Sequence, residues 1–222
     1  MKSFYSILIL SSLLGCKTNK PIVAQPTSNL VLNKSESNTD LEKLIAPYKN
    51  GMANAMNKVI GFSPSFEEKR RPSSALGSFM CDAVYKAASD SFKNLNFCLL
   101  NYGGIRSTLD SGEVTIGEMY QLMPFENEIV VLKFENRYLD SIRSIANQKG
   151  GEPISRFKVQ KEDNGKYFYM ATNDYLANGG DNYKILGYAT ERYDLGLKIR
   201  DALIYYVREN KKIIFDHTHR EL

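Results

Sequence analysis

The spacing of apolar residues predicts several helices from about residue 40 onward. Apolar side chains recur at intervals of three, four and seven residues, which is the spacing of one face of an α-helix. In the first of these segments, Pro47 and Gly51 predict a kink or an early end. The predicted helices cover residues 41–59, 73–90, 115–122, 136–150 and 194–210. Ser73 or Ser74 is the predicted cap of the second helix, and Thr115 that of the third.

Other segments have the composition of strands. Residues 96–101, `NFCLLN`, form a short, almost wholly apolar run of the kind buried on both faces of a sheet. Residues 127–135 predict a second strand, and residues 155–160 and 166–172 predict a hairpin, because Asn-Gly lies between them. Strands and helices mix without a regular repeat. The pattern therefore predicts an α/β (α+β) domain with mixed β-sheet covered by helices.

The N-terminal segment reads as an export signal. An apolar run follows Lys2 and ends at Leu13-Leu14-Gly15-Cys16, which resembles a bacterial lipobox. We expect a signal peptide over residues 1–15, lipidation of Cys16 and a flexible polar tether over 16–38. The domain then covers 39–222 in the cell envelope, anchored to a bacterial membrane and facing the periplasm. The alternative is an ordinary signal peptide with an incidental cysteine.

Composition narrows the possible chemistry. A chain of 222 residues with 43% hydrophobic residues suits one globular domain and a tail. The net charge of +4 is spread out rather than clustered, which argues against nucleic acid as a partner. Cys81 and Cys98 lie in apolar contexts and are interpreted as buried thiols rather than a disulfide or a nucleophile.

Two glycine pairs mark loops that suit a small ligand. Gly103-Gly104 follows the predicted strand 96–101, and Gly179-Gly180 follows the strand 166–172. Nearby are two flat rings, an acidic residue and groups that donate hydrogen bonds, as a nucleoside requires. These side chains are Arg70, Asn101, Arg106, Phe125, Tyr175 and Asp181.

Each of these residues also has an ordinary structural explanation. Phe125 and Tyr175 suit a hydrophobic core, and Asp181 suits a turn that caps its own backbone. Arg106 suits an ion pair with Asp110 or Glu113. Composition and spacing alone therefore indicate only a domain with two glycine-rich loops.

Several motifs in the same order resemble the C-terminal domain of the 5′-nucleotidase family. The resemblance covers about residues 40–215 and implies a fold in which two aromatic rings hold the base of a nucleotide. The matching motifs are Leu76-Gly77 with Asp82-Ala83, Asn101 to Arg106, Pro124 to Asn127, and Asn173 to Tyr183.

By position, the resemblance gives each candidate residue a role. Phe125 and Tyr175 correspond to the rings that sandwich the base, and Asp181 to the group that takes the ribose hydroxyls. Asn101 and Arg106 correspond to contacts from the first loop. Arg70 corresponds to a further arginine and Asn127 to a variable contact. The sequence departs from the family at Tyr102, where glycine is frequent, and at Ser73, where an acid is common.

The family's catalytic chemistry has no counterpart in these residues. Metal-assisted hydrolysis needs a cluster of Asp, His and Asn ligands, and the chain has two histidines, His217 and His219. We expect no catalytic residue, cofactor or metal site in this chain, and a frayed terminus around the histidines.

Three functions remain as hypotheses. In the first, the chain is the nucleotide-recognition part of a split 5′-nucleotidase and works with a separate metallophosphatase polypeptide. In the second, it is a stand-alone nucleoside- or nucleotide-binding envelope lipoprotein. In the third, it is an interaction lipoprotein that keeps the fold but not the ligand.

Overall fold

A computed structural model describes residues 39–155, 165–220 and 222. The predicted signal segment, the tether with Cys16 and most of the first hairpin strand lie outside the described residues. The internal contacts of the chain define two compact units, Met1–Glu42 and Lys43–Leu222. Within the described residues, no helix is long and apolar enough to cross a membrane.

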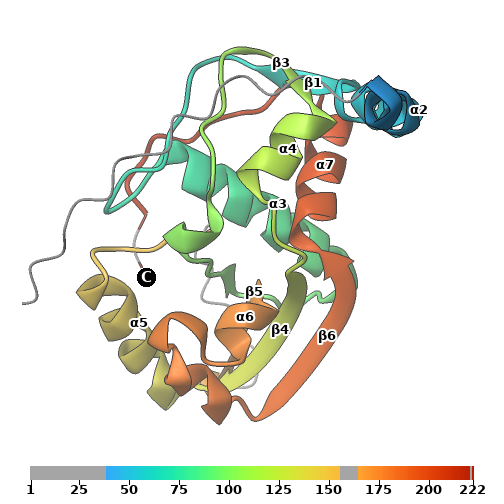
Figure 1. Ribbon diagram of the computed structural model, residues 1–222. Coiled ribbons are helices and arrows are strands. Elements are labelled where there is room, and N and C mark those ends of the chain that lie inside the picture. Colours follow the sequence, from blue (N-terminus) through green and yellow to red (C-terminus); the bar gives the residue numbers. More distant parts are fainter. Residues whose placement is uncertain (1–38, 156–164, 221) are drawn as a thin grey trace, which may run out of the picture. The chain divides into compact units, whose positions relative to one another are not determined.

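The described residues form helices and strands of mixed direction (Figure 1). The α-helices are α2 (Thr39–Met56), α3 (Ala75–Ser91), α4 (Ile116–Leu122), α5 (Leu139–Gln148), α6 (Asp174–Ala177) and α7 (Ile199–Asn210). The strands are β1 (Val59–Ser63), β2 (Phe97–Cys98), β3 (Gly112–Thr115), β4 (Glu128–Glu135), β5 (Tyr167–Asn173) and β6 (Glu191–Lys198). Short 3₁₀ helices are η2 (Tyr102–Gly104), η3 (Asn136–Tyr138), η5 (Gly180–Asn182) and η6 (Lys184–Tyr188).

The sheet that positions the site has four strands in the order β2-β5-β4-β6. Strand β2 pairs with β5 in parallel, whereas β4 is antiparallel to both β5 and β6. Strands β1 and β3 form a separate antiparallel pair. The α/β fold with mixed sheet predicted from the sequence is therefore confirmed.

Both faces of the four-stranded sheet are covered, and this explains the apolar run around β2. Cys98 and Leu100 belong to a core cluster with α3, α4 and α7, whereas Phe97 and Leu99 belong to a second cluster with α5, α6 and η6. Successive residues of a strand point to opposite faces, so each cluster takes alternate side chains. Figure 1 shows α3 and α7 on one side of the sheet and α5 and α6 on the other.

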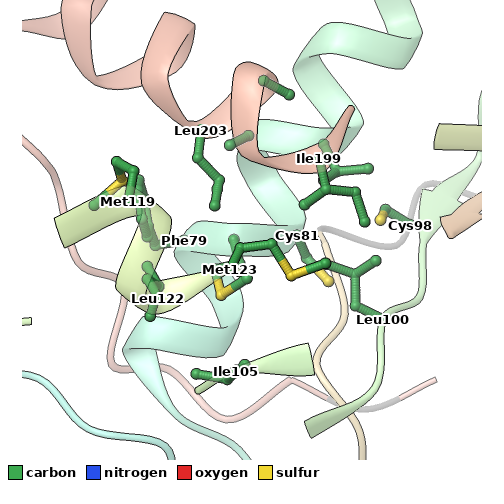
Figure 2. Close-up of a cluster of buried hydrophobic side chains, with 14 of the residues drawn as sticks. Phe79, Cys81, Cys98, Leu100, Ile105, Met119, Leu122, Met123, Ile199 and Leu203 are labelled. Atoms are coloured by element: carbon green, nitrogen blue, oxygen red, sulfur yellow. The ribbon is translucent and has the colours of Figure 1, made fainter. Parts of the chain in front are cut away.

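Helix α3 is the central element of the first cluster (Figure 2). Its N-cap is Ser74, whose hydroxyl accepts a hydrogen bond from the Gly77 amide at 3.1 Å. One face, predicted from the helical spacing, packs against α7, where Leu203 is fully buried. A capping box joins Thr115 and Glu118 at the start of α4, and this confirms Thr115 as the predicted cap.

The helices differ from the predicted bounds at two places. Helix α2 continues through Pro47 and Gly51 to Met56, so of the predicted kink or early end the early end does not occur, and the kink stays a prediction. Residues 194–198 form the end of β6 and not the start of the last helix, which begins at Ile199. Their alternating pattern, Leu195 and Leu197, fits a strand that pairs with β4, and this pairing outweighs the helical spacing.

The C-terminal tail is held against the domain instead of fraying. Ile213 is buried, and the Arg220 guanidinium donates to both carboxylate oxygens of Asp82 on α3, at 2.8 and 2.9 Å. The Thr218 hydroxyl and Arg220 hold the pKa of Asp216 well below its usual range. Asp82, part of a family motif, therefore anchors the tail.

We predict that Arg220→Ala lowers the free energy of unfolding by about 1–3 kcal/mol, because it leaves Asp82 and Asp216 without a charged partner. Urea unfolding measures the change. Arg208→Ala, at an exposed position of α7, is the matched control and is expected to unfold like the unchanged chain. Equal stability of the two variants would contradict the anchoring role.

Candidate functional site

Loops from three strands meet at one end of the four-stranded sheet. The parallel strands β2 and β5 both end there, and the antiparallel strand β4 begins there. Loops that follow or precede these ends therefore come together although they are far apart in the sequence. Between them lies a cavity of about 600 Å³, here called the loop cavity. It is lined by Asn101, Gly103, Gly104, Arg106, Phe125, Glu126, Asn127, Asp174, Tyr175 and Asp181.

The sequence predicts six of these lining residues as candidate contacts. They are Asn101, Arg106, Phe125, Asn127, Tyr175 and Asp181, and the structure brings all of them to one cavity. Their roles as ligand contacts stay predictions.

Asn101 connects the first loop to the second. Its side chain is buried, and its Nδ2 donates to Oδ2 of Asp181 at 2.7 Å. Its Oδ1 accepts from Nδ2 of Asn173 at 3.1 Å, and Asn173 in turn caps α6 through the Leu176 amide. A buried amide that uses both its donor and its acceptor has one orientation, so this chain of hydrogen bonds fixes where Asp181 lies.

Tyr175 holds the other oxygen of Asp181. The tyrosine hydroxyl donates to Oδ1 of Asp181 at 2.8 Å and accepts from the Asp181 amide at 3.1 Å. Asp181 has φ 49° and ψ 30°, the left-handed conformation that aspartate adopts more readily than most residues. The turn interpretation of Asp181 is therefore correct, and the same turn directs its carboxylate into the loop cavity.

Gly180 is required for this position of Tyr175. A Cβ at Gly180 would lie 2.5 Å from Cζ of the tyrosine ring and 2.6 Å from the tyrosine carbonyl oxygen. No side chain larger than hydrogen fits there without moving the ring. The second glycine pair is thus explained by close packing against an aromatic residue of the site.

The second aromatic residue that lines the cavity comes from a different loop. Phe125 lies between α4 and β4 and is 42% exposed, while Tyr175 is 46% exposed. Neither ring belongs to either core cluster, so the core interpretation of these residues is wrong. The guanidinium carbon of Arg106 lies 5.7 Å from the centroid of the Phe125 ring, within the range of a cation–π contact.

Acidic groups that the sequence analysis missed also line the loop cavity. Hydrogen bonds from Lys198 and Arg200 lower the pKa of Glu126 to about 2, so this carboxylate is ionised at neutral pH. Asp174 accepts from the Asn127 side chain at 2.8 Å. Glu126 and Asp174 both lie within motifs that carry the family resemblance. Their place in these motifs is the only sign of them in the sequence.

Arg70 does not line the loop cavity. Its side chain is 71% exposed and forms an ion pair with Glu68 at 2.9 Å. It borders a separate space of about 340 Å³, here called the basic hollow, together with Lys69, Arg71, Tyr102 and Gly103. Gly103 borders both spaces, so the basic hollow adjoins the loop cavity at the first glycine pair.

The buried side chain of Glu152 holds the backbone of the first loop at Tyr102. The carboxylate of Glu152 accepts from the Tyr102 amide at 2.8 Å and lies 3.9 Å from Arg71. Burial raises the pKa of Glu152, while the hydrogen bond from Tyr102 opposes this. Glu152 was not predicted, because only the folded chain brings it next to the loop that starts at Asn101.

The comparisons with known proteins agree with this fold and this set of motifs. Residues 51–135 match the family model described as 5′-nucleotidase, C-terminal domain. The fold resembles a 5′-nucleotidase precursor from Thermus thermophilus with a TM-score of 0.65 and 21% identity, over 81% of this chain and 42% of that chain. Residues 51–135 are therefore similar in sequence to 5′-nucleotidase C-terminal domains, and the fold of the chain agrees with that similarity.

Similar curated proteins are much longer than this chain. It is 23% identical to the trifunctional nucleotide phosphoesterase protein YfkN of Bacillus subtilis, over 80% of this chain and 15% of that protein. It is also 23% identical to the NAD 5′-nucleotidase of Haemophilus influenzae, over 72% of this chain and 33% of that protein. The chain therefore spans a third or less of the length of these two relatives.

We predict that Gly180→Ala lowers the free energy of unfolding by about 1–3 kcal/mol, because the added methyl group overlaps the Tyr175 ring. Urea unfolding measures the difference. Gly187→Ala is the matched control, since a Cβ at Gly187 meets nothing within 4 Å. If both variants unfold alike, the close contact between Gly180 and Tyr175 does not exist in solution.

Proposed function

We propose that this chain binds the nucleoside part of a nucleotide in the loop cavity and is the recognition part of a split 5′-nucleotidase. A separate metallophosphatase polypeptide carries out the hydrolysis. One observation carries the proposal. Two exposed aromatic rings, Phe125 and Tyr175, border one cavity beside the oriented carboxylate of Asp181, in a chain similar to 5′-nucleotidase C-terminal domains.

The two rings suit a planar base. Phe125 and Tyr175 are about half exposed, although large aromatic side chains usually bury more of their surface in a core. A base between them removes this apolar surface from water, and stacking contributes about 1–3 kcal/mol for each base. Every base has a flat face, so this contact selects planar rings without choosing among them.

Asp181 suits the sugar. Each of its oxygens already accepts one hydrogen bond, from Asn101 and from Tyr175. An ionised carboxylate has about four acceptor positions, so two remain for the adjacent hydroxyl groups of a ribose. The existing bonds hold the carboxylate in place, and binding does not have to order it.

The charges suggest where the phosphate goes. The loop cavity has three carboxylates, those of Glu126, Asp174 and Asp181, and one guanidinium, that of Arg106. A phosphate inside it meets mainly like charge, which is unfavourable. The adjoining basic hollow, with Lys69, Arg70 and Arg71, offers cations that suit phosphate oxygens. In this proposal the nucleoside occupies the loop cavity, and the phosphate points past Gly103 toward Arg70.

The hydrolytic step is assigned to a partner polypeptide. A two-metal centre needs a cluster of Asp, His and Asn ligands, and this proposal places that cluster in the partner. Lipidation at Cys16 completes the proposal: the acyl chains anchor the domain at the periplasmic side of a bacterial membrane, where it meets its partner.

Binding without catalysis is the second candidate. This chain supplies all the groups that the proposal assigns to the nucleoside, which are the rings of Phe125 and Tyr175 and the carboxylate of Asp181. A stand-alone nucleoside-binding lipoprotein is thus consistent with the same geometry. The two candidates differ only in whether a metallophosphatase becomes more active when the chain is added.

We predict that the purified chain binds adenosine in isothermal titration calorimetry, and that Phe125→Ala and Tyr175→Ala each weaken the affinity by about 10-fold or more. The physical reason is the loss of one stacked face and, for Tyr175→Ala, also of the hydroxyl that holds Asp181. Tyr205→Ala, at an exposed tyrosine on α7 outside the cavity, is the matched control and is expected to bind like the unchanged chain. Unchanged affinity in both site variants contradicts a base between the rings.

We predict that adding the chain to a metallophosphatase from the same organism raises kcat/KM for AMP. Release of inorganic phosphate measures the rate. Asp181→Asn is expected to remove most of the gain, because the amide supplies fewer acceptor positions for the ribose. If adenosine binds but no phosphatase gains activity, the stand-alone binding function holds and the split enzyme does not.

A further inference from the structure

Two cysteines lie against each other beneath the first loop. Cys81 belongs to α3 and Cys98 to β2, and both side chains are fully buried in the same core cluster. Helix α3 packs directly against β2. Figure 2 shows Cys81 on α3 and Cys98 on the strand beside it. The sequence prediction that both residues are buried is confirmed, but their proximity was not predicted.

Both cysteines are free thiols in this structure, and their side chains influence each other. Burial raises the pKa of Cys81 well above its usual range, and the hydrogen bond with the Cys98 thiol raises it further. A thiol that is buried and protonated is a poor nucleophile, so the folded chain protects the pair from reagents in solution. Any reaction between the two cysteines therefore belongs to the time before the core closes.

We propose that Cys81 and Cys98 form a disulfide that joins α3 to β2 when the chain folds in the presence of a disulfide oxidant. Nothing in the recognition site takes part in this reaction, so the inference is independent of the proposed function.

The reaction is ordinary thiol–disulfide exchange. One cysteine, as its thiolate, attacks the oxidant disulfide, forms a mixed disulfide and releases one oxidant thiol. The second cysteine, as its thiolate, then attacks the mixed disulfide, which forms the bond between Cys81 and Cys98 and releases the second oxidant thiol. The two cysteines lose two electrons and two protons in total. The oxidant gains them and ends as two thiols.

The position of the bond explains what it stabilises. Strand β2 has only the residues Phe97 and Cys98; it pairs with β5 on one side, and on the other the Cys98 carbonyl accepts from the Ser155 amide at 3.0 Å. Three residues later the chain reaches Asn101, which orients Asp181. A bond from Cys98 to α3 holds the start of this loop against the core. It closes a loop of about 18 residues, which restricts the unfolded chain.

The experiment uses the full chain without substitutions at Cys81 or Cys98, so that loss of folding in a variant does not obscure the result. The chain is unfolded and reduced, then refolded either in oxidised and reduced glutathione or with a strong reductant. Free thiols are alkylated after unfolding, and the peptides are mapped by mass spectrometry. A parallel chain with Cys16→Ser excludes pairing with the third cysteine.

We predict a peptide pair linked through Cys81 and Cys98 in the glutathione sample, in both the unchanged chain and the Cys16→Ser chain. The linked protein is expected to melt about 6–12 °C higher than the reduced protein. Full alkylation of both cysteines after refolding in glutathione overturns the proposal. A linked protein that melts no higher than the reduced one also overturns it, because the bond then does not stabilise the native packing.

Discussion

The hydrogen bond between Asn101 and Asp181 is the interaction on which the site depends. It joins the loop after β2 to the loop after β5, and these loops are close only because the two strands are parallel neighbours. Asn173 extends the connection to the start of α6. Without this chain of bonds, the Tyr175 hydroxyl alone would hold the Asp181 carboxylate at the loop cavity. The sheet topology thus supplies the proximity, and the buried amide supplies the orientation.

The arrangement separates rigid polar contacts from open apolar ones. Asn101 is buried, and its bonds are made before any ligand arrives, whereas Phe125 and Tyr175 keep nearly half of their surface in contact with water. Prior ordering of polar groups lowers the cost of binding, and exposed rings provide the apolar surface that binding covers. A ligand that joins a planar ring to a diol gains binding free energy from both features. A ligand with only a ring or only a diol gains less.

The sequence predicts the site better than it predicts some of the elements around it. Motifs in order placed Asn101, Arg106, Phe125, Tyr175 and Asp181 around one cavity, and the helical spacing found α3 and α4 with their caps. Helical periodicity gave the wrong element for residues 194–198. Their apolar residues are two apart, which fits a strand, and they pair with β4 as part of β6. Glu152, the tail contact of Arg220 and the adjacent thiols needed the fold, because each joins residues that no local pattern relates.

The residues of the site differ in how much they contribute to stability and to recognition. A variant therefore tests ligand binding only if it leaves the folding of the chain unchanged. The two rings lie outside both core clusters, so their removal takes away apolar contact surface without opening a hole in the core. Asn101 is different, because it is buried and its loss removes the partners of the Asn173 Nδ2 donor and of Asp181 Oδ2, while Tyr175 still holds Asp181 Oδ1. A change at Asn101 therefore alters folding and binding together. Tyr175 also holds Asp181 through its hydroxyl, so its removal changes the loop as well as the stacking face. Phe125 belongs to neither core cluster and makes no such bond to the second loop, which makes it the residue that tests most directly whether this cavity holds a nucleoside.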